Sequence, residues 1–233
     1  MKCWGVSDDV QVGSATGGNS VTPVAVPGLS SGMTSVVAGY KFACALTEGG
    51  GLKCWGDNDS GQLGIGATSG HSSGPVDVTG LSSGVAAVTA GEHHTCAQTD
   101  GGGVRCWGWN AEGQLGNGTT TDSTLPVGVA LSSGVTAVSA GSRHTCAVTA
   151  AGGVKCWGDN GSGRLGIPIS TPNSNVPVDA MGLSGGIVAV GAGYEHSCAL
   201  TAGGGVKCWG ANTNGQLGNG TTTDSSTPVN VSG

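Results

Sequence analysis

A single string of four residues, Lys/Arg-Cys-Trp-Gly, recurs five times in the chain, about every 51 residues, starting at positions 2, 53, 105, 155 and 207. Each copy is followed by a Gly-Gln-Leu-Gly-like turn and a Pro-Val pair, and the first four copies are then followed by a Leu-Ser-Ser-Gly-like turn and text resembling Ala-Gly-x-x-His-Thr-Cys-Ala. A unit of this length cannot bury an apolar face by itself, so neighbouring units must stack on one another. The chain is therefore predicted to be a repeat protein.

Composition limits which repeat architectures are possible. Of the 233 residues 48 are glycine, which disfavours long helices. The hydrophobic share of 37% and the net charge of −6 are unlike those of a disordered chain. No apolar run is long enough to cross a membrane, and the basic residues form no cluster of the kind that binds nucleic acid. An all-β, turn-rich chain with no membrane insertion and no nucleic-acid partner is expected.

Each unit reads as four short strands between turns. In one unit the strands are expected from Gly134, at 144–149, at 154–157 and, more weakly, around 126–129. Pro126 suits an edge position there, because proline cannot donate to a sheet ladder. Four short strands per unit of this length are typical of a β-propeller blade.

The count of half-units predicts how far the propeller extends. We treat residues 1–233 as a single propeller-repeat domain with units 2–52, 53–104, 105–154, 155–206 and a partial unit 207–233. This gives about four and a half blades. Residues 2–26 and 207–231 are the same half of the unit, so neither completes the other. An open arc, a fragment of a longer ring, is expected, with self-association through its open blade edges.

Eight of the nine cysteines fall into pairs with a constant separation of ten residues: Cys44 and Cys54, Cys96 and Cys106, Cys146 and Cys156, Cys198 and Cys208. Placing Cys44 opposite Cys54 sets Ala45 against Lys53 and Leu46 against Leu52 across a hairpin. Four intra-blade disulfides are expected, with Cys3 left as a free thiol. Zinc is a second interpretation, because His94, His144 and His196 each precede a cysteine by two residues, but the spacing is unlike that of zinc sites. Free thiols are a third.

Two kinds of variable loop position are candidates for binding. Trp109 follows the repeated Trp-Gly where the other units carry Val6, Asp57, Asp159 or Ala211, and a lone aromatic side chain there is a candidate recognition contact or a partly exposed filler. Asn110, the next residue, is a candidate with it. Asp57-Asn58 and Asp159-Asn160 occupy the equivalent positions. Asp57-Asn58-Asp59 resembles the start of a calcium loop but lacks the later glutamate, so an ordinary turn is favoured. No catalytic set, resident metal or cofactor is predicted.

The repeated text Ala-Gly-x-x-His-Thr-Cys-Ala through Cys-Trp-Gly-x-Asn-x-x-Gly-Gln-Leu-Gly resembles the repeat of the regulator of chromosome condensation family. The resemblance covers nearly the whole chain and recurs in register. It implies a propeller, usually of seven blades. The family includes exchange factors for small GTPases and a secreted bacterial inhibitor of β-lactamase, so it implies a fold more firmly than a function.

A non-catalytic bacterial protein, secreted or displayed at a surface, is expected to bind a protein or another macromolecule through loops on one propeller face. Disulfides would place it in an oxidising compartment, although no signal peptide is visible. Two alternatives are a structural spacer within a large surface protein and a guanine-nucleotide exchange factor, the second of which disulfides oppose.

Overall fold

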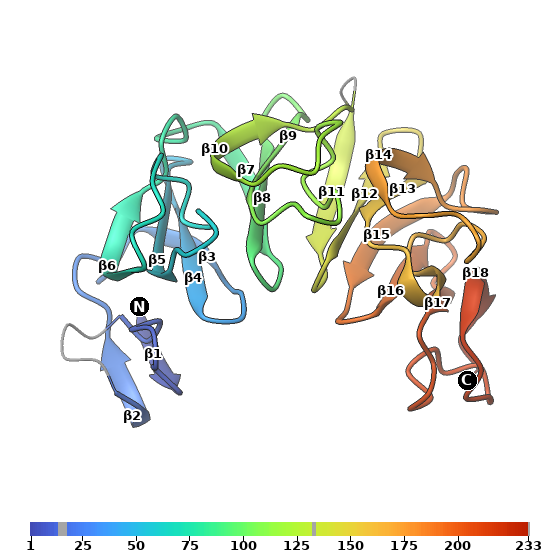
Figure 1. Ribbon diagram of the computed structural model, residues 1–233, viewed down its shortest axis with the longest axis horizontal. Helices are drawn as coiled ribbons and strands as arrows, with labels where there is room; N and C mark the ends of the chain where they lie inside the picture. The colour runs from blue at the N-terminus through green and yellow to red at the C-terminus, as the bar shows by residue number, and fades with distance from the viewer. Residues whose placement is uncertain (14–17, 132–133, 233) are drawn as a thin grey trace.

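The computed structural model describes residues 1–13, 18–131 and 134–232. Their strands form antiparallel sheets that follow one another along an arc (Figure 1), four of them with four strands each. The strands of these four sheets, in chain order, are β3 (Met33–Ala38), β4 (Phe42–Thr47), β5 (Leu52–Asp57) and β6 (His71–Asp77); β7 (Val85–Ala90), β8 (His94–Thr99), β9 (Val104–Gly108) and β10 (Ser123–Gly128); β11 (Val135–Ala140), β12 (His144–Thr149), β13 (Val154–Gly158) and β14 (Ser174–Asp179); and β15 (Ile187–Ala192), β16 (His196–Thr201), β17 (Val206–Gly210) and β18 (Ser225–Asn230). A short 3₁₀ turn, η1, spans Gly161–Gly163.

The first sheet has two strands, β1 (Lys2–Gly5) and β2 (Ser20–Ala25). They correspond to the third and fourth strands of the other blades, because β1 contains the repeated string that the third strand of each other blade contains, and β2 follows it. A sequence unit such as 53–104 thus contains the outer two strands of one blade and the inner two of the next. The two termini lie at opposite ends of an open arc (Figure 1), as the count of half-units predicts.

The predicted strand positions are confirmed, including the weak outer strand. In the third blade, β10 pairs only with β9, so it is an edge strand. Pro126 lies inside β10 and not at its start, at a register shift between Ser123 and Val127. A bulge at an edge tolerates proline because no ladder hydrogen bond is lost.

The apolar core lies between neighbouring blades. One buried cluster joins Phe42, Leu52 and Leu63 of the second blade to Val85 and Trp107 of the third. Four of the repeated tryptophans are fully buried, and their indole nitrogens donate 2.9 Å hydrogen bonds to a backbone carbonyl of the preceding blade. These donors are Trp55, Trp107, Trp157 and Trp209, and the acceptors are Gln11, Gln62, Gln114 and Arg164.

Among the repeated tryptophans, Trp4 does not pack between two blades. Its side chain is 64% exposed, because the described chain has no blade on that side of β1. Packing of this tryptophan depends on a neighbouring blade and not on its own hairpin.

Four disulfides close the central hairpins, joining the cysteine pairs that the spacing predicted. In the second blade Cys44 lies opposite Cys54, Ala45 opposite Lys53 and Leu46 opposite Leu52, so the predicted register is also confirmed. Cys3 is a free cysteine. Partial burial raises the pKa of its thiol. In the part of the chain that the structure describes, no helix has the length and apolar character needed to cross a membrane.

Candidate functional site

Alternate strand connections meet at one end of the blades, which we call the loop face. It comprises the short turns at 39–41, 91–93, 141–143 and 193–195, the strand ends Asp57 and Gly108, residues 6–13 after β1, and the longer loops that follow β5, β9, β13 and β17. Backbone hydrogen bonds connect the short turns of successive blades, from Tyr40 N to Glu92 O and from Glu92 N to Ser142 O, both at 3.3 Å. Positions about 50 residues apart therefore lie next to one another around the inside of the arc.

The glycine after each repeated tryptophan allows the long loop to pass close to this turn. Gly108 has φ +103°, and a Cβ atom there would lie 2.5 Å from the carbonyl oxygen of His93. Only glycine fits so close an approach with that backbone conformation. The residue that follows, Trp109, is consequently placed next to His93.

A cavity of about 430 Å³ opens on the loop face between the second and third blades. Three aromatic side chains line it. The ring centroids of Tyr40 and His93 are 5.8 Å apart, and those of His93 and Trp109 are 6.5 Å apart, both pairs in edge-to-face arrangements. We call this cavity, with Ser60 and the charged residues described next, the aromatic pocket.

Both signs of charge border the aromatic pocket. The guanidinium carbon of Arg143 lies 5.4 Å from the Trp109 ring centroid, and Lys41 Nζ lies 5.7 Å from that of Tyr40. Lys41 also pairs with Asp9 at 2.8 Å, and this contact raises the pKa of its ammonium group. Asp57 and Asp59 supply two carboxylates.

The two carboxylates differ in how they are held. Asp57 is buried, and its oxygens accept hydrogen bonds from the backbone of Asp59 (3.0 Å) and from Gln62 Nε2 (2.7 Å). The titratable side chain that faces Asp57 is His93, whose Nδ1 lies 3.9 Å from Asp57 Oδ2. Asp59 is exposed and forms no ion pair among the described residues. Within the same residues no three His, Cys, Asp or Glu side chains group as metal ligands.

The predicted asparagines hold the long loops. Asn110 is buried and donates to the carbonyls of Thr119 (3.0 Å) and Thr121 (2.9 Å), while its oxygen accepts from Leu115 N at 2.9 Å. Asn58, Asn160 and the unpredicted Asn212 are bonded in the same way. The side-chain amides of these asparagines form hydrogen bonds within their own loops. Among the predicted residues, the aspartates and Trp109 are therefore the ones that line the surface of the loop face.

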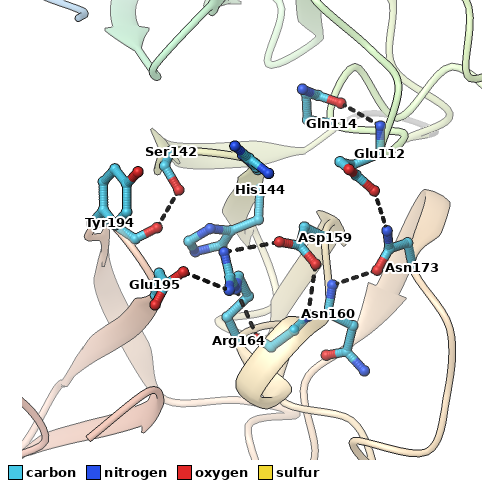
Figure 2. A network of polar contacts seen from close by, with 12 residues as sticks. Glu112, Gln114, Ser142, His144, Asp159, Asn160, Arg164, Asn173, Tyr194 and Glu195 are labelled. Atoms are coloured by element: carbon cyan, nitrogen blue, oxygen red, sulfur yellow. Dashed lines mark hydrogen bonds and ion pairs between the residues drawn. The ribbon is translucent and has the colours of Figure 1, made fainter. Parts of the chain in front are cut away.

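The third predicted position, Asp159, belongs to a separate ion cluster further along the loop face (Figure 2). Arg164 is buried, lies 3.0 Å from Asp159 and 3.4 Å from Glu195, and donates to the carbonyl of Gly161. Arg164 replaces the glutamine that the other units carry. Because Glu195 comes from the next blade, the cluster links the last two blades.

Two of the three repeated histidines link blades, and none of the three lines the aromatic pocket. His94 Nε2 lies 2.9 Å from Thr145 Oγ1, and His144 Nε2 lies 2.9 Å from Ser197 Oγ. Each hydroxyl already donates to a backbone carbonyl, so each histidine is the donor. Burial lowers the pKa of both imidazoles to about 3, with a further contribution from His93 for His94 and from Arg164 for His144.

The structure brings together Trp109 and Asp57, which the sequence singled out separately. Four other pocket residues were missed: Tyr40, Lys41, His93 and Arg143. All four occupy the two unspecified positions of the Ala-Gly-x-x-His string. Variation at those two positions inside an otherwise repeated string was the available signal.

This geometry defines the chain as an open β-propeller arc with an aromatic and charged pocket on its loop face. The family comparison agrees: the regulator of chromosome condensation (RCC1) repeat matches residues 50–98, 101–148, 151–200 and 204–233. The chain belongs to the RCC1 repeat family.

Among similar proteins, the ultraviolet-B receptor UVR8 of Arabidopsis thaliana is 31% identical over 232 residues, which cover 98% of this chain and 52% of UVR8. The human E3 ubiquitin-protein ligase HERC2 is 36% identical over 119 residues, half of this chain and 2% of HERC2. The fold is similar to that in the crystal structure of yeast RCC1 (Prp20) bound to Kap60, with a TM-score of 0.84 and 22% identity over 99% of this chain and 56% of that one. Human WBSCR16 gives a TM-score of 0.83 at 24% identity, covering 97% and 60%. The chain thus spans about half the length of UVR8 and of these structures.

Proposed function

We propose that this chain is a non-catalytic binding module that holds a protein partner on its loop face, with Trp109 at the centre of the contact. The observation that carries this proposal is the aromatic pocket, in which residues that do not follow the repeat converge from five strand connections. Tryptophan, tyrosine and arginine are the residues that most often dominate the energy of protein interfaces. Propellers of this fold are known in complexes with proteins, as in yeast RCC1 with Kap60.

The setting we propose is an oxidising one, at a cell surface or outside the cell. Four disulfides, three of them fully buried, support it, because such bonds persist mainly where thiols are not kept reduced. A spacer function would not require a cluster of exposed aromatic and charged side chains at one place on the arc, so we favour binding.

Site-specific photocrosslinking tests the proposal. A benzophenone amino acid is introduced in place of Ala111, which is exposed in the loop beside Trp109, or in place of Gly101, which is exposed on the opposite face. The oxidised chain is then irradiated with the surface and secreted proteins of its source. We expect discrete adducts from position 111 only.

The matched variant is Trp109→Ala, since the last unit carries Ala211 at the equivalent position. We expect it to remove the adducts while leaving the thermal unfolding midpoint almost unchanged. Equal crosslinking from both faces, or adducts that persist without Trp109, would contradict the proposal.

A further inference from the structure

Charge is distributed unevenly between the two faces of the arc. The loop face carries these acidic residues: Asp8, Asp9, Asp57, Asp59, Glu92, Glu112, Asp122, Asp159, Glu195 and Asp224. Its basic residues are Lys41, Arg143 and Arg164. The rest of the chain holds four acidic and five basic residues, so the net charge of −6 arises on the loop face.

The basic residues of the loop face are already engaged. Lys41 pairs with Asp9, and Arg164 pairs with Asp159 and Glu195. Arg143 lies over Trp109, with its nearest carboxylate oxygen, on Glu92, at 3.8 Å. The unpaired charge that an approaching partner meets is therefore negative, and a positively charged surface would be attracted and oriented by it.

The aromatic pocket suits one positively charged side chain. Tyr40 and Trp109 each hold a cation of this chain within 6 Å of the ring centroid, so their rings are accessible to cations. The carboxylates of Asp57 and Asp59 lie at the same cavity. A cavity of about 430 Å³ has room for a lysine or arginine side chain.

We propose that the loop face recognises a basic segment of its protein partner and that a lysine or arginine side chain of that segment enters the aromatic pocket, with its charge beside Asp57 and Asp59. This inference rests on the proposed function and specifies the chemistry of the partner. Arg143 then competes with the incoming cation for Trp109 and for the negative potential of the site. Removing the positive charge of Arg143 should therefore strengthen the binding of a basic segment. An anionic ligand would instead pair with Arg143 and would bind more weakly without it.

The test uses random 12-residue peptides displayed on phage and selected on the immobilised, oxidised 233-residue chain in 50 mM NaCl. We expect the recovered peptides to be enriched in lysine and arginine relative to the starting library. Two recovered peptides are then synthesised with a fluorescent label, and their dissociation constants are measured in 50 and 300 mM NaCl. Higher salt should weaken binding at least tenfold, because the attraction between exposed charges is screened.

Three variants test where on the chain the peptide binds and whether the charge that the pocket recognises is positive. Asp57→Asn with Asp59→Asn should weaken binding at least tenfold, whereas Glu48→Gln with Asp100→Asn, the same charge change on the opposite face, should alter it less than twofold. Arg143→Glu, which introduces the residue that the next unit carries at Glu195, should strengthen binding.

The possible failures are distinguishable. Recovery of no peptide that depends on Trp109 would overturn the proposed function and this inference with it. Recovery of Trp109-dependent peptides that are acidic or show no charge bias would leave the proposed function standing and overturn the inference. Loss of binding in the Arg143→Glu variant would likewise overturn it, since that result indicates an anionic ligand.

Discussion

His94 and His144 show how a single residue can connect two blades. Each donates to a hydroxyl of the next blade, and that hydroxyl in turn donates to the carbonyl that also accepts the bond from the buried tryptophan of its own blade. Phe42 occupies the same position in the second blade and packs without such a bond. The histidine is therefore an added polar link and not a requirement of the fold.

These histidines should make stability depend on pH. Their folded pKa of about 3 lies below the value of 6.5 expected in the unfolded chain, so the unfolded state binds more protons between these values. The stabilisation is complete above pH 6.5 and is lost as the pH falls toward 3. Between pH 7 and pH 5 each histidine should lower the free energy of unfolding by about 2 kcal/mol.

Urea unfolding followed at pH 7, 6 and 5 measures this dependence. The double variant His94→Phe with His144→Phe is the control, and its unfolding free energy should change much less over the same range. A pH dependence equal to that of the unsubstituted chain would show that other groups cause it.

At the scale of the element, the central hairpin of each blade is the most tightly determined unit. Cross-strand cysteines face each other in four blades, and in each the hairpin turn has the same length. The outer strand is less regular, with a register shift where it pairs to the third strand in each of the five sheets. Length variation between units is therefore taken up outside the disulfide-bonded hairpin.

Loss of one disulfide should destabilise the chain measurably. Cys146→Ala with Cys156→Ala removes a ten-residue crosslink and should lower the free energy of unfolding by about 2–3 kcal/mol through loop-closure entropy. Cys3→Ala is the matched control and should change it by less than 1 kcal/mol, in keeping with a half-exposed residue. Maleimide labelling of the denatured, unreduced chain should modify one thiol, and nine after reduction. More than one reactive thiol before reduction would contradict the pairing.

At the scale of the molecule, the arc leaves apolar side chains uncovered at both ends. Trp4 and Val36 are exposed near the first sheet, at 64% and 52%, and Leu200 and Val206 are each 38% exposed in the last. Between blades, side chains at these repeat positions pack against a neighbour. Exposed apolar surface and open strand edges favour association.

The 233-residue chain on its own should therefore self-associate. Light scattering coupled to size-exclusion chromatography should give a mass above 22.3 kDa that rises with protein concentration. The variant Trp4→Ser with Leu200→Gln, which introduces the residue found at the equivalent position Gln98, should shift the mass toward that of the monomer, while Cys3→Ser separates out any disulfide-linked dimer. A monomer at all concentrations, with the unsubstituted chain, would refute the prediction.

The sequence by itself determined the blade, the hairpin register and the cysteine pairs, because these depend on contacts that recur with the repeat and span few residues. Cys146 opposite Cys156 follows from spacing alone. The aromatic pocket was decided by the tertiary structure, since Tyr40, His93 and Trp109 belong to three different units and Arg143 to another blade than Trp109, so that they meet only when blades stack in register around the arc. The two neighbouring residues also differ in burial. Asn110 is buried and its amide holds the loop, whereas Trp109 lines the pocket. Packing between blades, which no local pattern encodes, gave two adjacent residues these different roles.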